Sequence, residues 1–103
     1  WKKAVQMLDE MQQNRIEPDV ISFSSAITAC EKAGQWEETL ELLEEMRRCG
    51  VRPDVITFNA TINACGKAGK WEKALELLGD MPQCGVSPDV VSFNAAIGAC
   101  GKG

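Results

Sequence analysis

A repeat of 35 residues runs through this chain and limits what it can fold into. Segments 20–54 and 55–89 are identical at 21 of 35 aligned positions without a gap, and segments 1–19 and 90–103 continue the same register. Three landmarks recur at this spacing, a Trp, a Cys and the Asp of a Pro-Asp pair: Trp1, Trp36 and Trp71; Cys30, Cys65 and Cys100; Asp19, Asp54 and Asp89. A fixed period of this length is typical of solenoids, in which each unit packs on the next.

The first half of each unit has the pattern of an amphipathic helix. Its apolar or small residues recur at positions i, i+3, i+4, i+7 and i+10. In segment 20–54 this apolar stripe consists of Phe23, Ala26, Ile27, Cys30 and Ala33. A Ser or Thr stands just before the stripe in each copy, and we expect these residues to be the N-caps of the helices: Ser22, Thr57 and Ser92.

The second half of each unit is also helical, and it begins near the Trp. After Trp36, the side chains of Leu40, Leu43 and Met46 fall on one face. Because neither helix can bury its stripe alone, we predict an all-α fold, a right-handed α-solenoid of stacked helix-turn-helix repeats. Pro82 stands inside the last turn of the corresponding helix of the next unit, where it costs about 3 kcal/mol. That helix should end early or kink.

The repeat divides the chain into one array with four parts. We expect 1–19 to hold the second helix of a partial repeat, 20–54 and 55–89 to be full repeats, and 90–103 to hold a first helix. The chain begins without Met, a basic segment or an apolar leader, so we expect it to be a piece of a longer array. Further repeats would then lie on both sides, and any targeting segment outside.

The composition argues against several kinds of site. The chain has no His, which removes His-based metal sites, catalytic triads and the usual general base near neutral pH. Equivalent Cys on helices stacked about 8–10 Å apart are too distant for a disulfide or a zinc site. We therefore predict small core residues at Cys30, Cys65 and Cys100, with no metal, cofactor, small-molecule substrate or enzymatic activity. No apolar run reaches the ~18 residues of a membrane span, so we predict no membrane partner.

The acidic residues concentrate on one side of the predicted solenoid. The net charge is −4, from 11 Lys and Arg against 15 Asp and Glu, which disfavours polyanion binding through bulk charge. Most of the acids fall on the predicted second helices: Asp9, Glu10, Glu37, Glu38, Glu41, Glu44, Glu45, Glu72, Glu76 and Asp80. Glu31 lies late on a predicted first helix, beside Lys32. The face formed by the first helices should therefore be neutral to weakly basic.

Each first helix carries a second stripe whose residue types suit a nucleotide. An aliphatic residue, a short polar residue and a Lys recur at each step of the array. The aliphatic side chains can sandwich a base, and the Lys can meet a phosphate as a point charge. The predicted base-sandwich residues are Ile21, Ile56 and Val91, and the predicted phosphate contacts are Lys32, Lys67 and Lys102.

The unit resembles the pentatricopeptide repeat along the whole chain. Its form is V-I-T-F-N-A-x-I-x-A-C-x-K-A-G-x-W-E-x-A-L-E-L-L-x-x-M-x-x-x-G-V-x-P-D. The tetratricopeptide repeat differs, because it has a 34-residue period and a Tyr near its start, and this chain has no Tyr. The resemblance implies single-stranded RNA as the partner, with one base bound per repeat. It also implies a mitochondrial or chloroplast location and a role in RNA processing, stabilisation, editing or translation.

The resemblance further implies which residues choose the base. They are the residue five positions after each Pro-Asp and the Asp that closes the same unit. Ser24 with Asp54 is a pair that favours G, and Asn59 with Asp89 is a pair that favours U. With RNA running 5′ to 3′ along the chain, the two full repeats are expected to read 5′-GU-3′. Two residues of these types lack their partner within the chain: Asp19 and Asn94.

Two other functions remain open at this stage. A protein-interaction scaffold would use the same concave groove to hold a peptide, as tetratricopeptide arrays do. An enzyme would carry its catalytic domain outside this chain, as family members with deaminase or nuclease domains do. The stripe of polar residues also fits an ordinary solvated groove with no ligand.

Overall fold

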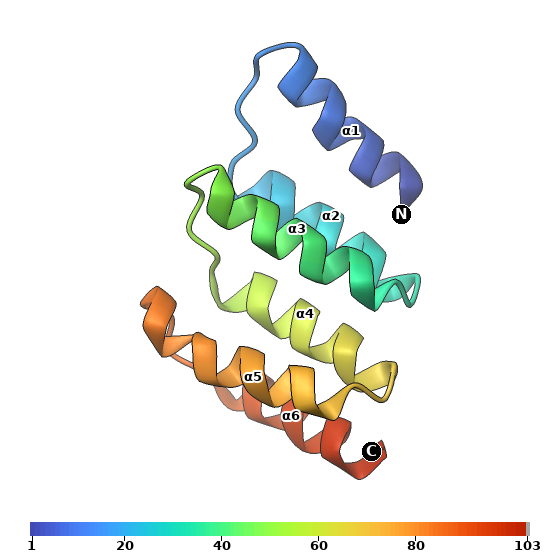
Figure 1. Cartoon of the computed structure of the whole chain (residues 1–103), viewed down its shortest axis with the longest axis vertical. Helices are drawn as coiled ribbons and strands as arrows, with labels where there is room; N and C mark the ends of the chain where they lie inside the picture. Colours follow the sequence, from blue (N-terminus) through green and yellow to red (C-terminus); the bar gives the residue numbers. More distant parts are fainter. Residues whose placement is uncertain (103) are drawn as a thin grey trace.

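The structure is a computed structural model that describes residues 1–102 and the side chains of residues 1–101. This part of the chain contains six α-helices and one 3₁₀ turn, and no strand. The elements are α1 (Lys2–Gln13), α2 (Val20–Lys32), α3 (Trp36–Arg48), α4 (Val55–Lys67), α5 (Trp71–Asp80), η1 (Pro82–Cys84) and α6 (Val90–Lys102). Figure 1 shows them stacked along the long axis, with α1 and α6 at opposite ends of the stack. The predicted all-α, right-handed solenoid is confirmed.

The apolar stripes of the first helices form the core. Phe23, Ile27 and their equivalents Phe58 and Ile62 are completely buried, because the second helix of the same unit covers them. In α6 the equivalent Phe93 is 52% exposed, since no further helix covers this face among the described residues.

The cysteines follow the same division between covered and uncovered helices. Cys30 and Cys65 are buried core residues, as predicted, and burial raises the pKa of the Cys65 thiol to about 11. The prediction of a core position was wrong for Cys100, which is exposed on the uncovered face of α6. Within the described residues, no group of His, Cys, Asp and Glu side chains is arranged to hold a metal ion.

Aspartates, and not the predicted Ser and Thr residues, cap the first helices. Each Asp carboxylate accepts the backbone N–H of the residue three positions later, as Asp54 does from Thr57 at 2.9 Å. The Thr57 hydroxyl accepts the Asp54 N–H in return, at 2.8 Å, which completes a capping box. The three caps and their N3 partners are Asp19 with Ser22, Asp54 with Thr57, and Asp89 with Ser92. The prediction was wrong because each helix begins before its apolar stripe, directly after the Pro-Asp pair.

Pro82 shortens α5 without disturbing the repeat. This helix ends at Asp80 after 10 residues, against 13 in α3, and a 3₁₀ turn follows. The early end agrees with the prediction. Both units nevertheless close in the same way, because the N–H groups of Val51 and Val86 donate to the carbonyls of Met46 and Met81 at 2.9 Å. The next first helix therefore starts in register.

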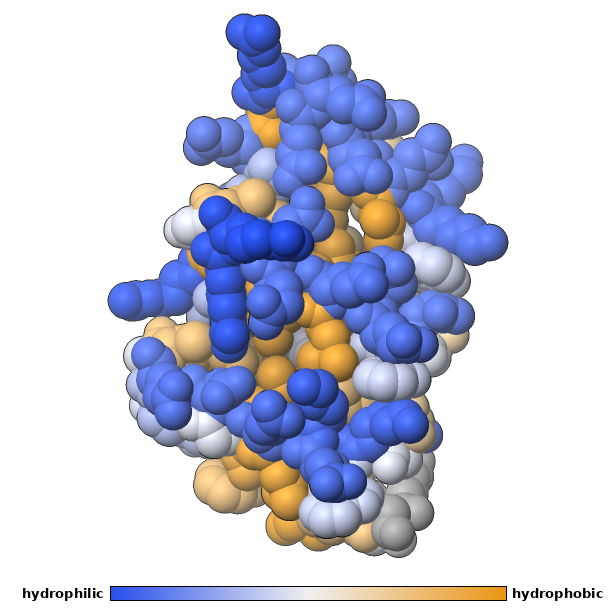
Figure 2. Space-filling model, in the orientation of Figure 1, coloured by the Kyte–Doolittle hydropathy of each residue, from blue (hydrophilic) through white to orange (hydrophobic). Residues whose placement is uncertain are grey.

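The second helices form an acidic outer face. The ten acids predicted to lie there are on α1, α3 and α5. Figure 2 views the side on which α3 and α5 lie in front, and its surface is largely hydrophilic. None of the described helices has the length and apolar character needed to cross a membrane.

Candidate functional site

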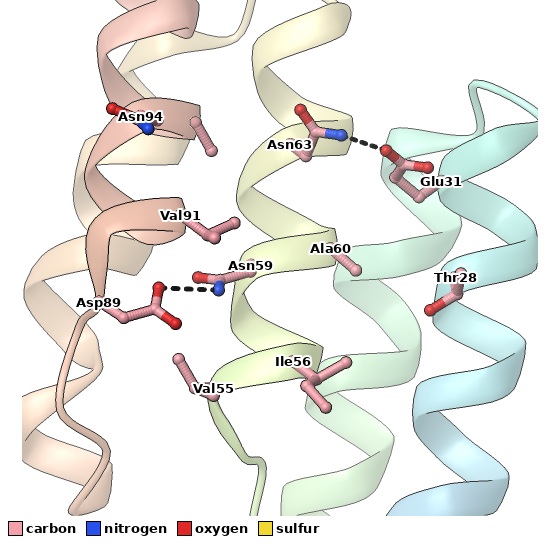
Figure 3. A pocket seen from close by; sticks show the side chains of 11 residues that line it. Thr28, Glu31, Val55, Ile56, Asn59, Ala60, Asn63, Asp89, Val91 and Asn94 are labelled. Carbon is pink, nitrogen blue, oxygen red and sulfur yellow. Dashed lines mark hydrogen bonds between the residues drawn. The ribbon is translucent and has the colours of Figure 1, made fainter.

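A groove of about 640 Å³ lies over α4, between α2 and α6. It is lined by the second stripe of three successive first helices, as Figure 3 shows. The lining residues are Thr28, Glu31, Val55, Ile56, Asn59, Ala60, Asn63, Asp89, Val91, Asn94 and Ala95. The structure thus brings together five of the predicted site residues: Ile56, Asn59, Asp89, Val91 and Asn94.

The predicted base-sandwich residues are exposed aliphatic side chains on consecutive first helices. Ile21 is 69% exposed, Ile56 is 60% exposed and Val91 is 54% exposed. Ile56 and Val91 line the groove, and Ile21 lies one unit earlier on α2, outside it. Their exposure leaves apolar surface available at each step, which a flat base can cover.

Asn59 and Asp89, predicted as one base-selecting pair, are in direct contact. The Asn59 amide nitrogen Nδ2 donates to Asp89 Oδ1 at 3.1 Å, and the Ser92 hydroxyl donates to Asn59 Oδ1. These two bonds fix the orientation of the amide, which keeps one further N–H and one further lone pair for a ligand. Asn59 can therefore present a donor and an acceptor side by side.

The Asp89 carboxylate serves the helix and the groove at once. The backbone N–H of Ser92, followed by the side chain of Asn59, lowers the pKa of Asp89 below the usual value of 3.8. The pKa of Asp19 is lowered chiefly by the backbone N–H of Ser22. Asp89 is thus a charged acceptor at neutral pH, and it holds both the α6 cap and the Asn59 amide.

Ser24 and Asp54, the other predicted pair, do not touch in the same way. The Ser24 hydroxyl donates to the carbonyl of Ile21 in its own helix at 3.2 Å. The Asp54 carboxylate accepts from the backbone and the hydroxyl of Thr57. Within the described part of the chain no hydrogen bond joins Ser24 to Asp54, and neither lines the groove. Asp19 stands at the N-terminus of α2, also outside the groove.

A polar cluster at the groove, formed by Glu31, Asn63 and Lys67, was missed in the sequence. Glu31, placed by the sequence beside Lys32, is only 8% exposed and lies against α4. Its Oε1 accepts from the Asn63 amide and from the Lys67 ammonium, the latter at 3.0 Å. The repeat could have indicated this contact. The residue of α4 equivalent to Glu31 is Gly66, and Asn63 and Lys67 lie on either side of it in the sequence of the same helix.

The predicted phosphate contacts therefore differ in their surroundings. Lys32 is exposed and has no ion-pair partner among the described side chains, whereas Lys67 is paired with Glu31. Lys67 also lines a smaller hollow beside the groove, together with Asn94. The predicted contact through Lys102 falls outside the described side chains.

Comparison with known proteins identifies related chains. A family model described as the pentatricopeptide repeat domain matches residues 6–68 and again residues 41–103. The crystal structure of the pentatricopeptide repeat protein PPR10 from maize superposes with a TM-score of 0.84 and 29% identity, covering 93% of this chain and 14% of that one. PPR10 in complex with an 18-nt psaJ RNA element gives 38% identity and a TM-score of 0.84, over 96% of this chain and 14% of that one.

A further match shows the fold alone. The PPR domain of Arabidopsis thaliana protein-only RNase P 1 in complex with tRNA has a TM-score of 0.83 at 15% identity, over 95% of this chain and 51% of that one. No curated protein sequence matches the chain. This chain thus spans a small part of the PPR10 length, as one section of a similar solenoid.

Proposed function

The chain belongs to the pentatricopeptide repeat family, and we propose that it binds single-stranded RNA in the groove along α2, α4 and α6, with one base per repeat. The observation that carries this proposal is the hydrogen bond between Asn59 and Asp89, which holds the donor and acceptor of the Asn59 amide at the wall of the groove. The RNA complex of the similar PPR10 supports the choice of ligand. Binding is the whole of the proposed activity, and no described residue is assigned a catalytic role.

In this proposal each side chain around α4 has one task. Ile56 and Val91 enclose the two faces of a base, because they are exposed on adjacent first helices. Asn59 faces the Watson–Crick edge, and its paired donor and acceptor fit the edge of uracil. Ser24, with Asp54 closing its unit, is small enough to admit a purine and favours G. The two full repeats then read 5′-GU-3′.

The affinity of the chain alone should be low. Base stacking contributes about 1–3 kcal/mol per base, so two bases correspond to a millimolar or weaker dissociation constant. We therefore propose that the chain works as part of a longer array. Uncovered apolar side chains at both ends support this, with Met7 of α1 59% exposed and Ile97 of α6 67% exposed. A flanking repeat at each end would bury them.

The family resemblance also supports a setting for this binding. We place it in mitochondria or chloroplasts, in the processing, stabilisation, editing or translation of RNA. Fractionation of cells followed by detection of the whole protein tests this part, and a protein confined to the cytosol would contradict it.

An NMR titration tests the proposed binding directly. Short RNAs that differ only at a central GU or AC are added to the 15N-labelled chain at low salt. We expect larger amide shifts with GU, centred on Ser24, Asn59 and Asp89. The variant Asn59→Ser should move the second preference from U toward G. Equal and diffuse shifts with both RNAs would contradict base reading, and a peptide scaffold would then be the better explanation.

A further inference from the structure

The groove proposed to hold RNA contains a buried carboxylate. Glu31 is 8% exposed, and its Oε1 atom accepts from Asn63 and from Lys67. It is the acid that the sequence places late on a first helix, away from the acidic outer face. A negative charge at this place opposes a polyanionic ligand.

The acid belongs to one step of the array. The equivalent positions of the other two first helices hold Gly66 and Gly101. Where α2 meets α4, the Glu31 carboxylate contacts the Asn63 amide and the Lys67 ammonium. At the junction of α4 and α6, Gly66 faces Ala99 directly, and a Cβ at Gly66 would lie 3.0 Å from the Ala99 Cβ. Nothing in the repeat requires an acid at this position.

The charge of Lys67 is compensated by this contact. The ammonium lies 3.0 Å from Glu31 Oε1, with the Lys67 side chain 51% exposed and the Glu31 side chain 10% exposed. A phosphate that approaches the exposed ammonium of Lys67 is also repelled by the Glu31 carboxylate behind it. The attraction of Lys67 for an anion is therefore reduced, whereas Lys32 has no ion-pair partner among the described side chains.

We infer that Glu31 is a negative determinant of RNA affinity that weakens the backbone contact at Lys67, whichever base is bound. This inference rests on the proposed function. It assigns one step of the array a weak hold on the phosphate, so that base reading at Asn59 contributes more of the binding there. Because the loss is the same for every base, it lowers the affinity and leaves the ratio of affinities for different bases unchanged.

The variant Glu31→Gln separates charge from structure. A Gln side chain keeps the same shape, and its Oε1 still accepts from Asn63 and Lys67, so the junction of α2 and α4 is preserved. We expect a dissociation constant about three- to fivefold lower for GU-containing RNA. The plot of log affinity against log salt should also steepen by about 0.7, the contribution of one more neutralised phosphate on a single strand.

A control with the same change of net charge is available on the outer face. Glu45 of α3 also accepts a side-chain hydrogen bond, from Gln12 at 3.4 Å. Glu45→Gln should leave the affinity and the salt slope close to those of the unmodified chain. A second pair of variants carries Lys67→Gln, once in the unmodified chain and once together with Glu31→Gln. The loss of affinity should be larger when Glu31 is already Gln, because the ammonium then acts at full strength.

The outcomes distinguish this inference from the function on which it rests. If Glu31→Gln binds no tighter than Glu45→Gln while the preference for GU over AC persists, the inference is wrong and the proposed function stands. If neither the unmodified chain nor any variant responds to RNA, the proposed function fails first. A gain in affinity for Glu31→Gln that disappears when Lys67→Gln is added supports both the inference and the proposed function.

Discussion

The two junctions between first helices have the same backbone pattern and different chemistry. Where α2 meets α4, Glu31 is held by Asn63 and Lys67. Where α4 meets α6, the equivalent Gly66 packs against Ala99, and a Cβ added to Gly66 would lie 3.0 Å from the Ala99 Cβ. The first junction is a polar cluster, and the second is a close contact of small residues.

The proposed base-selecting pairs also differ between these two junctions. Asn59 reaches across to Asp89 and Ser92, so its amide has one orientation. Ser24 is too short for this and bonds to the Ile21 carbonyl in its own helix. The comparison teaches that the core stripe sets the register of the array, and that a few exposed positions on the first helices make its steps chemically different.

The largest effect should come from filling the close contact of the second junction. Gly66→Val places a branched side chain against Ala99 Cβ and Cα, and we expect a loss of about 1–3 kcal/mol in the free energy of unfolding. Urea denaturation followed by circular dichroism measures it.

Gly98→Val on α6 is the matched control, since nothing lies within 4 Å of a Cβ there. Its stability should change by about 0.5 kcal/mol or less. Equal losses for the two variants would mean that the junction of α4 and α6 is not tightly packed, and would remove this part of the comparison.

A second change makes the two reading positions alike. Ser24→Asn gives the first full repeat the same pair as the second, with Asp54 in the role of Asp89. We expect the first preference to move from G to U, by roughly tenfold in relative affinity, or about 1.4 kcal/mol. Titrations with RNAs containing GU and UU measure the change. An unaltered preference for G would show that position 24 does not read the base.

The sequence was sufficient for the architecture, because the architecture depends on periodicity. The 35-residue period predicted the helix pairs, and buried positions such as Phe58 and Ile62 followed from the stripe. Even the early end of α5 at Pro82 could be predicted, since proline removes a donor that the helix requires.

The sequence was less sufficient for contacts between units. The pairing of Glu31 with Lys67 joins residues 36 positions apart, and it depends on how closely two helices approach and on which rotamer each side chain takes. The aspartate caps were missed because the apolar stripe begins three residues after the true helix start. The first miss concerns side-chain geometry, which a pattern of residue types does not contain, and the second concerns where the helix begins.

A third prediction concerns how Asn59 is held. Ser92→Ala removes the hydroxyl that donates to Asn59 Oδ1, so only the bond from Nδ2 to Asp89 still holds the amide and its orientation is less fixed. We expect the preference for U over C at this step to fall about threefold, in keeping with one hydrogen bond. Ser92→Thr should restore it, because Thr57 makes the same cap in the preceding unit. The titration with RNAs differing at this base measures the ratio.

The control for Ser92 is the equivalent residue of the other junction. Thr57→Ala also removes a capping-box hydroxyl, but this hydroxyl bonds to Asp54 and, among the described residues, to neither Asn59 nor Ser24. This variant should lose stability while the preference for U over C at Asn59 persists. If Thr57→Ala changes selectivity as much as Ser92→Ala does, the effect arises from the cap and not from the orientation of Asn59.

The smallest effect we predict is in the titration of the two aspartates whose pKa values are lowered. Asp89 accepts from the Asn59 side chain as well as from the Ser92 backbone, whereas the pKa of Asp19 is lowered chiefly by the backbone and the hydroxyl of Ser22. Asn59→Ala removes one of these donors, so it should raise the pKa of Asp89 toward 3.8 and leave the pKa of Asp19 unchanged. Carboxyl chemical shifts followed by NMR through the acid range measure both values in one sample.

The sign of the pH dependence follows from the direction of these shifts. A carboxylate whose pKa is lower in the folded chain contributes stability above the unfolded value of about 3.8, and this stability is lost as the pH falls through the folded pKa. Asn59→Ala should therefore weaken the dependence of the unfolding free energy on pH below about 4, since less of the shift at Asp89 remains. Because Asp89 is exposed, solvent keeps the effect small. An Asp89 pKa that does not respond to Asn59→Ala would mean that the cap alone sets its charge, and the two junctions would then be electrostatically alike at their aspartates.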